Sequence, residues 1–168
     1  MPMMNKPFRK RSFLDSFRDA AIGVWKCIKL EKNMRIHITM LVYMSALGFA
    51  LQLSRGEFAA LFLAIALVIS MEMINTAIEK LCDFSKTDYD KLIRVIKDIS
   101  AGAVLVSSVF SVFVGIAVFG KPELWTLIKS VFASPATVII ILLSLAASFL
   151  FIGAGPQKIW NKINKRGL

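Results

Sequence analysis

Four apolar runs constrain this sequence more than any other feature, because each approaches the roughly 20 residues that a helix needs to cross a bilayer. The runs cover residues 36–54, 58–78, 99–119 and 135–154. Hydrophobic residues make up 57% of the chain, whereas soluble domains contain roughly 45–50% apolar residues. Only helices and closed barrels satisfy the backbone inside hydrocarbon, and runs of this length favour helices. The sequence therefore predicts an all-α membrane protein with four crossings.

Basic residues alternate between the segments that flank these runs. They gather before the first run, between the second and third, and after the fourth, whereas the other two links carry few. Cytoplasmic loops of membrane proteins are enriched in Lys and Arg, so we expect both termini and segment 80–97 to be cytoplasmic. The formal net charge of +10 flanks the apolar runs and forms no face with interleaved aromatics, so nucleic acid is not an expected partner.

The segment 10–29 carries apolar residues at three- and four-residue steps, among them Phe13, Phe17 and Val24. This period predicts an amphipathic helix, with Trp25 as its anchor at the membrane interface. The alternative is a helix that packs on a loop of the protein itself. The chain is expected to divide into a cytoplasmic N-terminus with this surface helix (1–35), a transmembrane core (36–120), and an external link, extra transmembrane helix and basic cytoplasmic tail (121–168).

The link after the third run contains "KPELW" and "ASP", which predict turns. The stretch "GIAVFGKP", residues 115–122, matches the first seven positions of a phosphate-binding P-loop, but Pro122 stands where Ser or Thr would hold magnesium. The stretch also ends an apolar run, whereas a P-loop follows a strand. We reject this match, so any nucleotide chemistry is expected elsewhere.

The stretch "MEMINTAIEKLCD", residues 71–83, places three acids where the second apolar run ends. At about 100° per residue, one helix face collects oxygen-bearing side chains that each lie within roughly 40° of Glu72: Thr76, Glu79 and Asp83. Asn75 lies about 60° to one side. A charge inside hydrocarbon costs at least a few kcal/mol, so a carboxylate at this depth indicates function. The alternative is that Glu72 is protonated and hydrogen-bonds a neighbouring helix.

Two more acids, Glu31 and Asp98, precede the first and third runs, which places them at the expected cytoplasmic edge. Mg²⁺ is usually bound in proteins by one or two carboxylates together with substrate phosphates. Glu72 lies deeper, where only the head group of a lipid would meet it. This arrangement suggests a reaction between a water-soluble phosphate donor and a membrane-embedded hydroxyl.

The segments "EKNMRIH", "EMINTAIE", "DYDKLIRVIKD" and "AGAVL" follow one another at characteristic spacings. In this order they closely resemble the small bacterial membrane-integral lipid kinases, the diacylglycerol kinase and undecaprenol kinase family, over about residues 12–120. The resemblance implies a three-helix transmembrane kinase core, with run four as an addition, that phosphorylates a lipid alcohol with ATP and Mg²⁺. It also implies a homotrimer with active sites shared between subunits. "EKNMRIH" leans toward the undecaprenol kinase branch.

The resemblance also implies a role for each matching residue. Glu72 would be the general base that takes the proton from the lipid hydroxyl. Glu31 and Glu79 would hold the metal that is bound to ATP. The other nucleotide-binding residues that the resemblance implies are Asn75, Asp88, Tyr89, Asp90, Lys97 and Asp98.

Three positions depart from the family's pattern. Asp90 stands where the family usually has His, and Asp19 stands where it usually has an aromatic residue. An arginine that some members use near the lipid falls at Ser12, beside Arg11. The competing hypotheses are a catalytically inactive membrane protein of the same fold and a proton-coupled transporter that uses Glu72. Lipid-dependent consumption of ATP would separate these classes.

Overall fold

The structure, a computed structural model, describes residues 12–84 and 91–164. This part of the chain forms six helices and no strand, which confirms the predicted all-α class. The helices are α1 (Phe13–Leu30), α2 (Lys32–Ala50), α3 (Arg55–Phe84), α4 (Lys91–Phe119), α5 (Pro122–Ala133) and α6 (Pro135–Asn164).

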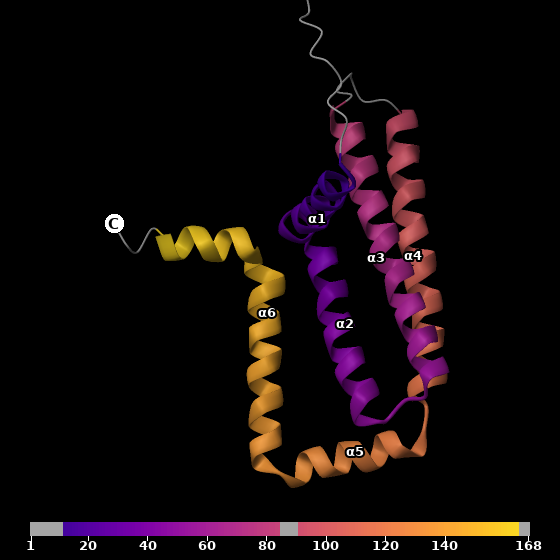
Figure 1. Ribbon diagram of the computed structural model, residues 1–168, viewed down its shortest axis with the longest axis vertical. Helices are drawn as coiled ribbons and strands as arrows, with labels where there is room; N and C mark the ends of the chain where they lie inside the picture. Colours follow the sequence, from indigo (N-terminus) through magenta and orange to yellow (C-terminus); the bar gives the residue numbers. More distant parts are fainter. Residues whose placement is uncertain (1–11, 85–90, 165–168) are drawn as a thin grey trace, which may run out of the picture.

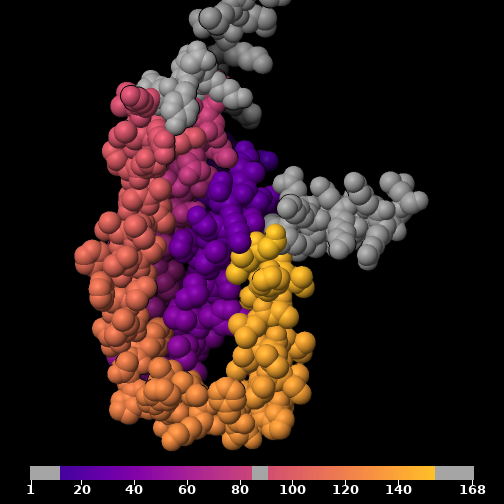
Figure 2. Space-filling model, turned by 180° about the vertical axis from the view of Figure 1, so that it is seen from behind, coloured from indigo at the N-terminus to yellow at the C-terminus, as the bar shows by residue number. Residues whose placement is uncertain are grey.

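The long helices α2, α3, α4 and α6 lie side by side in alternating directions, and the shorter α1 and α5 lie across the two ends (Figure 1). α3 and α4 pack along their length, α2 packs against α3, and α6 packs against α2. Seen from behind, α1 and α2 lie between α4 and α6 (Figure 2). The end of α3 that carries the predicted acids is therefore the end at which α1 lies.

Three described helices are long and apolar enough to cross a membrane: α3, α4 and the Pro135–Gly153 part of α6. α2, the fourth expected crossing, does not reach the same hydropathy, because Asn33, Arg35 and His37 occupy its first half. Its 19 residues measure about 28 Å, close to the ~30 Å hydrocarbon core, and it lies alongside α3 (Figure 1). A crossing by α2 stays a prediction.

α5 replaces the turn-rich link that was predicted between the third and fourth runs. Pro122 is its first residue, where the missing N–H costs nothing and the fixed φ favours a helix. Leu124, Ile128 and Val131 line a cavity of about 370 Å³ with residues of α2 and α6. The chain breaks at residues 120–121 and at Ser134, as predicted, but the segment between them is a helix because Pro122 starts one. The rejected P-loop match, residues 115–122, consists of the last residues of α4, a two-residue link and the first residue of α5.

The aromatic side chains of α1 are exposed, including Phe13 (76%), Phe17 (63%) and Trp25 (50%). The buried residue of this helix is Cys27, and the helix contacts α2, α3 and α6. Exposure of the aromatic residues leaves them available to a membrane surface. It favours the interfacial interpretation of this segment over packing on a loop of the protein itself.

Candidate active site

Glu72 lies on α3 and is almost completely buried, with 2% of its surface exposed. Its carboxylate accepts a hydrogen bond from the side chain of Asn33, in the first turn of α2. Glu31 and Glu79 lie close enough to interact with it electrostatically. Burying a carboxylate costs free energy unless it is hydrogen-bonded, and α2 supplies that bond. The predicted base therefore lies between two helices with two more carboxylates nearby.

Asn75 connects α4 to Glu79. Ser100 of α4 donates a hydrogen bond to Asn75 Oδ1 at 2.6 Å, and Asn75 Nδ2 donates to Glu79 Oε1 at 3.1 Å. Asn75 and Ser100 are both buried. The direction of the Glu79 carboxylate is therefore fixed by a chain of two hydrogen bonds that begins on another helix.

Thr76 connects α3 to α1. Its hydroxyl donates to the backbone carbonyl of Glu72 at 2.9 Å and accepts from the Cys27 thiol at an Sγ–Oγ1 distance of 3.5 Å. Burial raises the pKa of the Cys27 thiol, so the thiol stays protonated and continues to donate at neutral pH. α1 is thereby attached to the turn of α3 that carries Glu72.

Two lysines bring positive charge to the same end of the molecule. Lys97 of α4 pairs with Asp83 of α3 at an Nζ–Oδ1 distance of 2.7 Å. Lys80 of α3 reaches Glu31 Oε1 at 3.8 Å. Both pairs are partly exposed, and exposed ion pairs contribute at most about 1 kcal/mol. These ion pairs therefore contribute little to stability, and they place two positive charges beside the carboxylates at this end of α3.

Glu31 and Glu79, the predicted metal ligands, suit a metal ion that is shared with substrate phosphates. Glu31 is the single residue between α1 and α2, and Glu79 is oriented by Asn75. Within the described ranges, no three Asp, Glu, His or Cys side chains are arranged to hold an ion. Mg²⁺ does not need such a cluster when substrate phosphates and water complete its shell. The donor set of Glu31 and Glu79 therefore fits a nucleotide-bound Mg²⁺.

The structure does not bring every predicted residue to this place. Asp98 is exposed and lies about 160° around α4 from Ser100, the residue that contacts Asn75. Asp88, Tyr89 and Asp90 lie outside the described residues. The predicted residues that do gather around the end of α3 are Glu31, Glu72, Asn75, Glu79 and Lys97.

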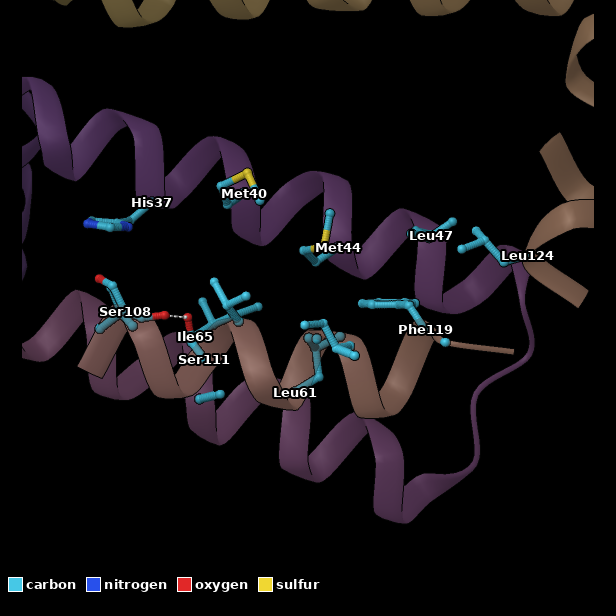
Figure 3. A pocket seen from close by; sticks show the side chains of 16 residues that line it. His37, Met40, Met44, Leu47, Leu61, Ile65, Ser108, Ser111, Phe119 and Leu124 are labelled. Carbon is cyan, nitrogen blue, oxygen red and sulfur yellow. Dashed lines mark hydrogen bonds between the residues drawn. The ribbon is translucent and has the colours of Figure 1, made fainter. Parts of the chain in front are cut away.

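An apolar groove of about 610 Å³ runs between α2, α3 and α4 (Figure 3). Phe119 and Leu124 lie at one end of it, and His37 lies at the other. Val68, also in the lining, precedes Glu72 by about one helical turn on the same face of α3. The groove therefore leads along α3 toward the Glu72 carboxylate.

Asn33, Ser100 and Cys27 were not among the residues predicted from the sequence. Each makes its contact with a different helix, so no periodicity within its own segment identifies it. Asn33 gave the strongest signal, because it is a polar residue two positions after Glu31 at the start of an apolar run. Recognising Ser100 and Cys27 required knowledge of which helices pack together.

Residues 18–119 match the family described as prokaryotic diacylglycerol kinase. The chain is 35% identical over 107 residues to the undecaprenol kinase of Bacillus subtilis, a match that covers 64% of this chain and 87% of that protein. It is also 35% identical over 121 residues to the diacylglycerol kinase of Synechocystis sp., covering 68% of this chain and 69% of that protein. No solved structure matches the chain.

The fold and these matches define a membrane lipid kinase. The chain belongs to the prokaryotic diacylglycerol kinase family, as the sequence motifs predicted. The family match ends with α4, so α5 and α6 lie outside it.

Proposed function

We propose that this kinase transfers the γ-phosphoryl group of Mg²⁺-bound ATP to the hydroxyl of undecaprenol or diacylglycerol, at the cytoplasmic face of a bacterial cell membrane. The observation that carries the proposal is the buried Glu72 carboxylate, about one helical turn beyond the lining of the apolar groove. A lipid whose hydrocarbon tail lies in this groove presents its head group at that carboxylate.

Glu72 acts as the general base. It takes the proton of the lipid hydroxyl while the lipid oxygen bonds to the γ-phosphorus and the bond from that phosphorus to ADP breaks. The hydrogen bond from Asn33 restricts the orientations that the carboxylate can adopt. Burial of Glu72 also limits the access of water, which competes with the lipid for the phosphoryl group.

The nucleotide lies at the more exposed end of α3. Glu31 and Glu79 would hold the Mg²⁺ that accompanies the nucleotide, and the hydrogen bond from Asn75 at 3.1 Å keeps Glu79 oriented. When bound, the ion neutralises charge on the transferring phosphoryl group. Lys80 and Lys97 neutralise further phosphate charge. The remaining nucleotide contacts that we assign are Asp88, Tyr89, Asp90 and Asp98.

The active form is a homotrimer in which each site takes residues from two subunits. Asp98 faces away from Asn75 within one chain, so it serves the site of a neighbouring subunit. The exposed apolar side chains of α3 and α4, such as Leu63, Phe110 and Phe113, support contacts with lipid or with other subunits.

The preferred lipid is tested with the purified full-length protein in nanodiscs, supplied with ATP, Mg²⁺ and either undecaprenol or diacylglycerol. We expect ATP consumption that requires a lipid alcohol and stops when Mg²⁺ is chelated, with undecaprenol preferred because "EKNMRIH" favours that branch. Phosphorylated lipid is measured directly. ATP consumption that is independent of lipid, or no phosphorylated product with either alcohol, would contradict the proposal.

A further inference from the structure

Arg35 is a buried cation where α1, α2 and α6 meet, with 7% of its surface exposed. The acceptors that the described residues offer to its guanidinium are backbone carbonyls. Nη1 donates to Ile28 at 3.1 Å and to Lys29 at 3.2 Å, and Nε donates to Ile152 at 3.1 Å. A buried charge is costly unless it is hydrogen-bonded. These bonds offset the cost and join three helices through one side chain.

The two acceptors on α1 are available because α1 ends there. The last four carbonyls of a helix have no partner inside it, and Ile28 and Lys29 lie in the last turn of α1. The partial negative charge at a helix C-terminus also favours a cation. Arg35 thereby fastens the end of α1 to the second turn of α2.

The third acceptor is available because of Pro156. Within an α-helix, the Ile152 carbonyl would accept from the backbone N–H of residue 156, but proline has no N–H. Arg35 donates to this carbonyl instead. α6 also bends toward its C-terminal end (Figure 1), as helices with an internal proline do. The proline of α6 thus supplies the acceptor that Arg35 uses.

Glu31 is the residue that this junction holds in place. It is the single residue between α1 and α2, it has extended backbone angles of φ −105° and ψ 126°, and it precedes Arg35 by four positions. The angle between α1 and α2 therefore sets where the Glu31 carboxylate lies relative to Lys80 and Glu72. Loosening the junction would therefore move the Glu31 carboxylate and leave Glu72 unchanged.

We infer, on the basis of the nucleotide-binding role proposed for Glu31, that Arg35 and the Ile152 carbonyl position Glu31. α6, which lies outside the family match, thereby tunes the affinity of the kinase for the metal-bound nucleotide. Arg35 is a positioning residue: it acts through Glu31 and not on the substrate.

Three substitutions in the full-length protein separate this role from general packing. Pro156→Ala restores an N–H that draws the Ile152 carbonyl back into α6 and away from Arg35. Arg35→Lys keeps the charge and removes the planar fork that reaches three acceptors. Pro135→Ala is the matched control, because Pro135 is the first residue of the same helix, where a missing N–H frees no carbonyl.

Steady-state kinetics of the variants in nanodiscs test the effect on the nucleotide. We expect Pro156→Ala and Arg35→Lys to raise the KM for Mg·ATP by about tenfold, as expected for a lost hydrogen bond to a charged group. Turnover at saturating ATP and the KM for lipid should stay near wild type, as should every constant of Pro135→Ala. An unchanged nucleotide KM in both variants, or an equal effect of Pro135→Ala, overturns the inference.

A distance measurement that needs no activity distinguishes the ways in which the idea could fail. Spin labels at Ser16→Cys on α1 and Leu150→Cys on α6, in a background without Cys27 and Cys82, report the α1–α6 distance distribution. We expect Pro156→Ala to broaden it and Pro135→Ala to leave it unchanged. Broadening without a change in nucleotide KM would show that Arg35 joins helices without positioning Glu31. If Glu31→Gln itself leaves that KM unchanged, the role proposed for Glu31 fails first.

Discussion

The side chains of the site hold one another across helix boundaries. Ser100 of α4 donates to Asn75 of α3, and Asn75 donates to Glu79. An asparagine amide carries an acceptor oxygen and a donor nitrogen, so the bond from Ser100 also decides which way the amide faces. The direction of the Glu79 carboxylate therefore depends on a residue of α4 that does not touch it.

Removing the Ser100 hydroxyl tests this dependence. Ser100→Ala leaves the Asn75 amide free to rotate, so we expect the KM for Mg·ATP to rise by about three- to tenfold, the range for one lost hydrogen bond. The KM for lipid should not change, because Glu79 belongs to the nucleotide end. Ser107→Ala is the control, since Ser107 is also buried on α4 but donates to the Val104 carbonyl. Equal effects of the two variants would reduce Ser100 to a packing residue.

The residues of α3 could be predicted from the sequence, because acids inside an apolar run are conspicuous and the helical period places them on one face. Asn33 and Ser100 could not, because their contacts depend on the packing of α2 and α4 against α3. Asp98 shows a related limit. Its position before the third run predicts its depth in the membrane but not the face of α4 on which it lies.

Among the helices, α6 contacts α2 at two levels and supplies none of the side chains proposed for chemistry. The Tyr43 hydroxyl of α2 lies 3.1 Å from Ser144 Oγ and 2.9 Å from Ser148 Oγ of α6. Arg35 bonds to the Ile152 carbonyl nearer the site. α6 therefore supports α2, the helix that carries Asn33.

Truncation after Lys121 tests what α5 and α6 contribute. The family match ends at residue 119, so we expect a membrane-inserted enzyme with turnover close to that of the full chain at saturating ATP. The KM for the nucleotide should rise, because Arg35 loses its acceptor on α6. Folding is checked by circular dichroism and gel filtration. A well-folded truncated protein without activity would show that α6 helps to form the site.

The long helices were predictable because runs of about 20 apolar residues have few alternatives in a membrane. α5 was not predictable, because a proline such as the one in "KPELW" indicates a turn when it falls inside a segment. When it is the first residue of a helix, it favours that helix. Only the packing of Leu124 and Val131 over the cavity between α2 and α6 decides between the two.

The molecule has two distinct ends, so its orientation in the membrane can be predicted and tested. α5 lies across one end, and the start of α4 lies at the opposite end together with the residues of the site (Figure 1). The distribution of basic residues predicts that the site end is cytoplasmic. If the site end is cytoplasmic, ATP from the cytoplasm reaches the site, and the apolar groove lies within the bilayer.

Cysteines at the two ends test this topology. Glu123→Cys on α5 and Lys91→Cys at the start of α4 replace exposed residues, and are examined one at a time in a background without Cys27 and Cys82. On intact cells, an impermeant thiol reagent should label position 123 and should reach position 91 only after the cells are lysed. The reverse pattern would invert the proposed orientation.

The central claim is that Glu72 acts on the lipid hydroxyl and Glu79 acts on the metal-bound nucleotide, and comparing Glu72→Gln with Glu79→Gln in the same lipid tests it most directly. Glu72→Gln keeps the shape and the acceptor for Asn33 but cannot take a proton, so turnover should fall by at least about a hundredfold while ATP binding survives. Glu79→Gln should weaken Mg·ATP binding as well as turnover, and excess Mg²⁺ should partly restore it. Near-normal turnover of Glu72→Gln would show that Glu72 is a buried packing residue and would contradict the mechanism.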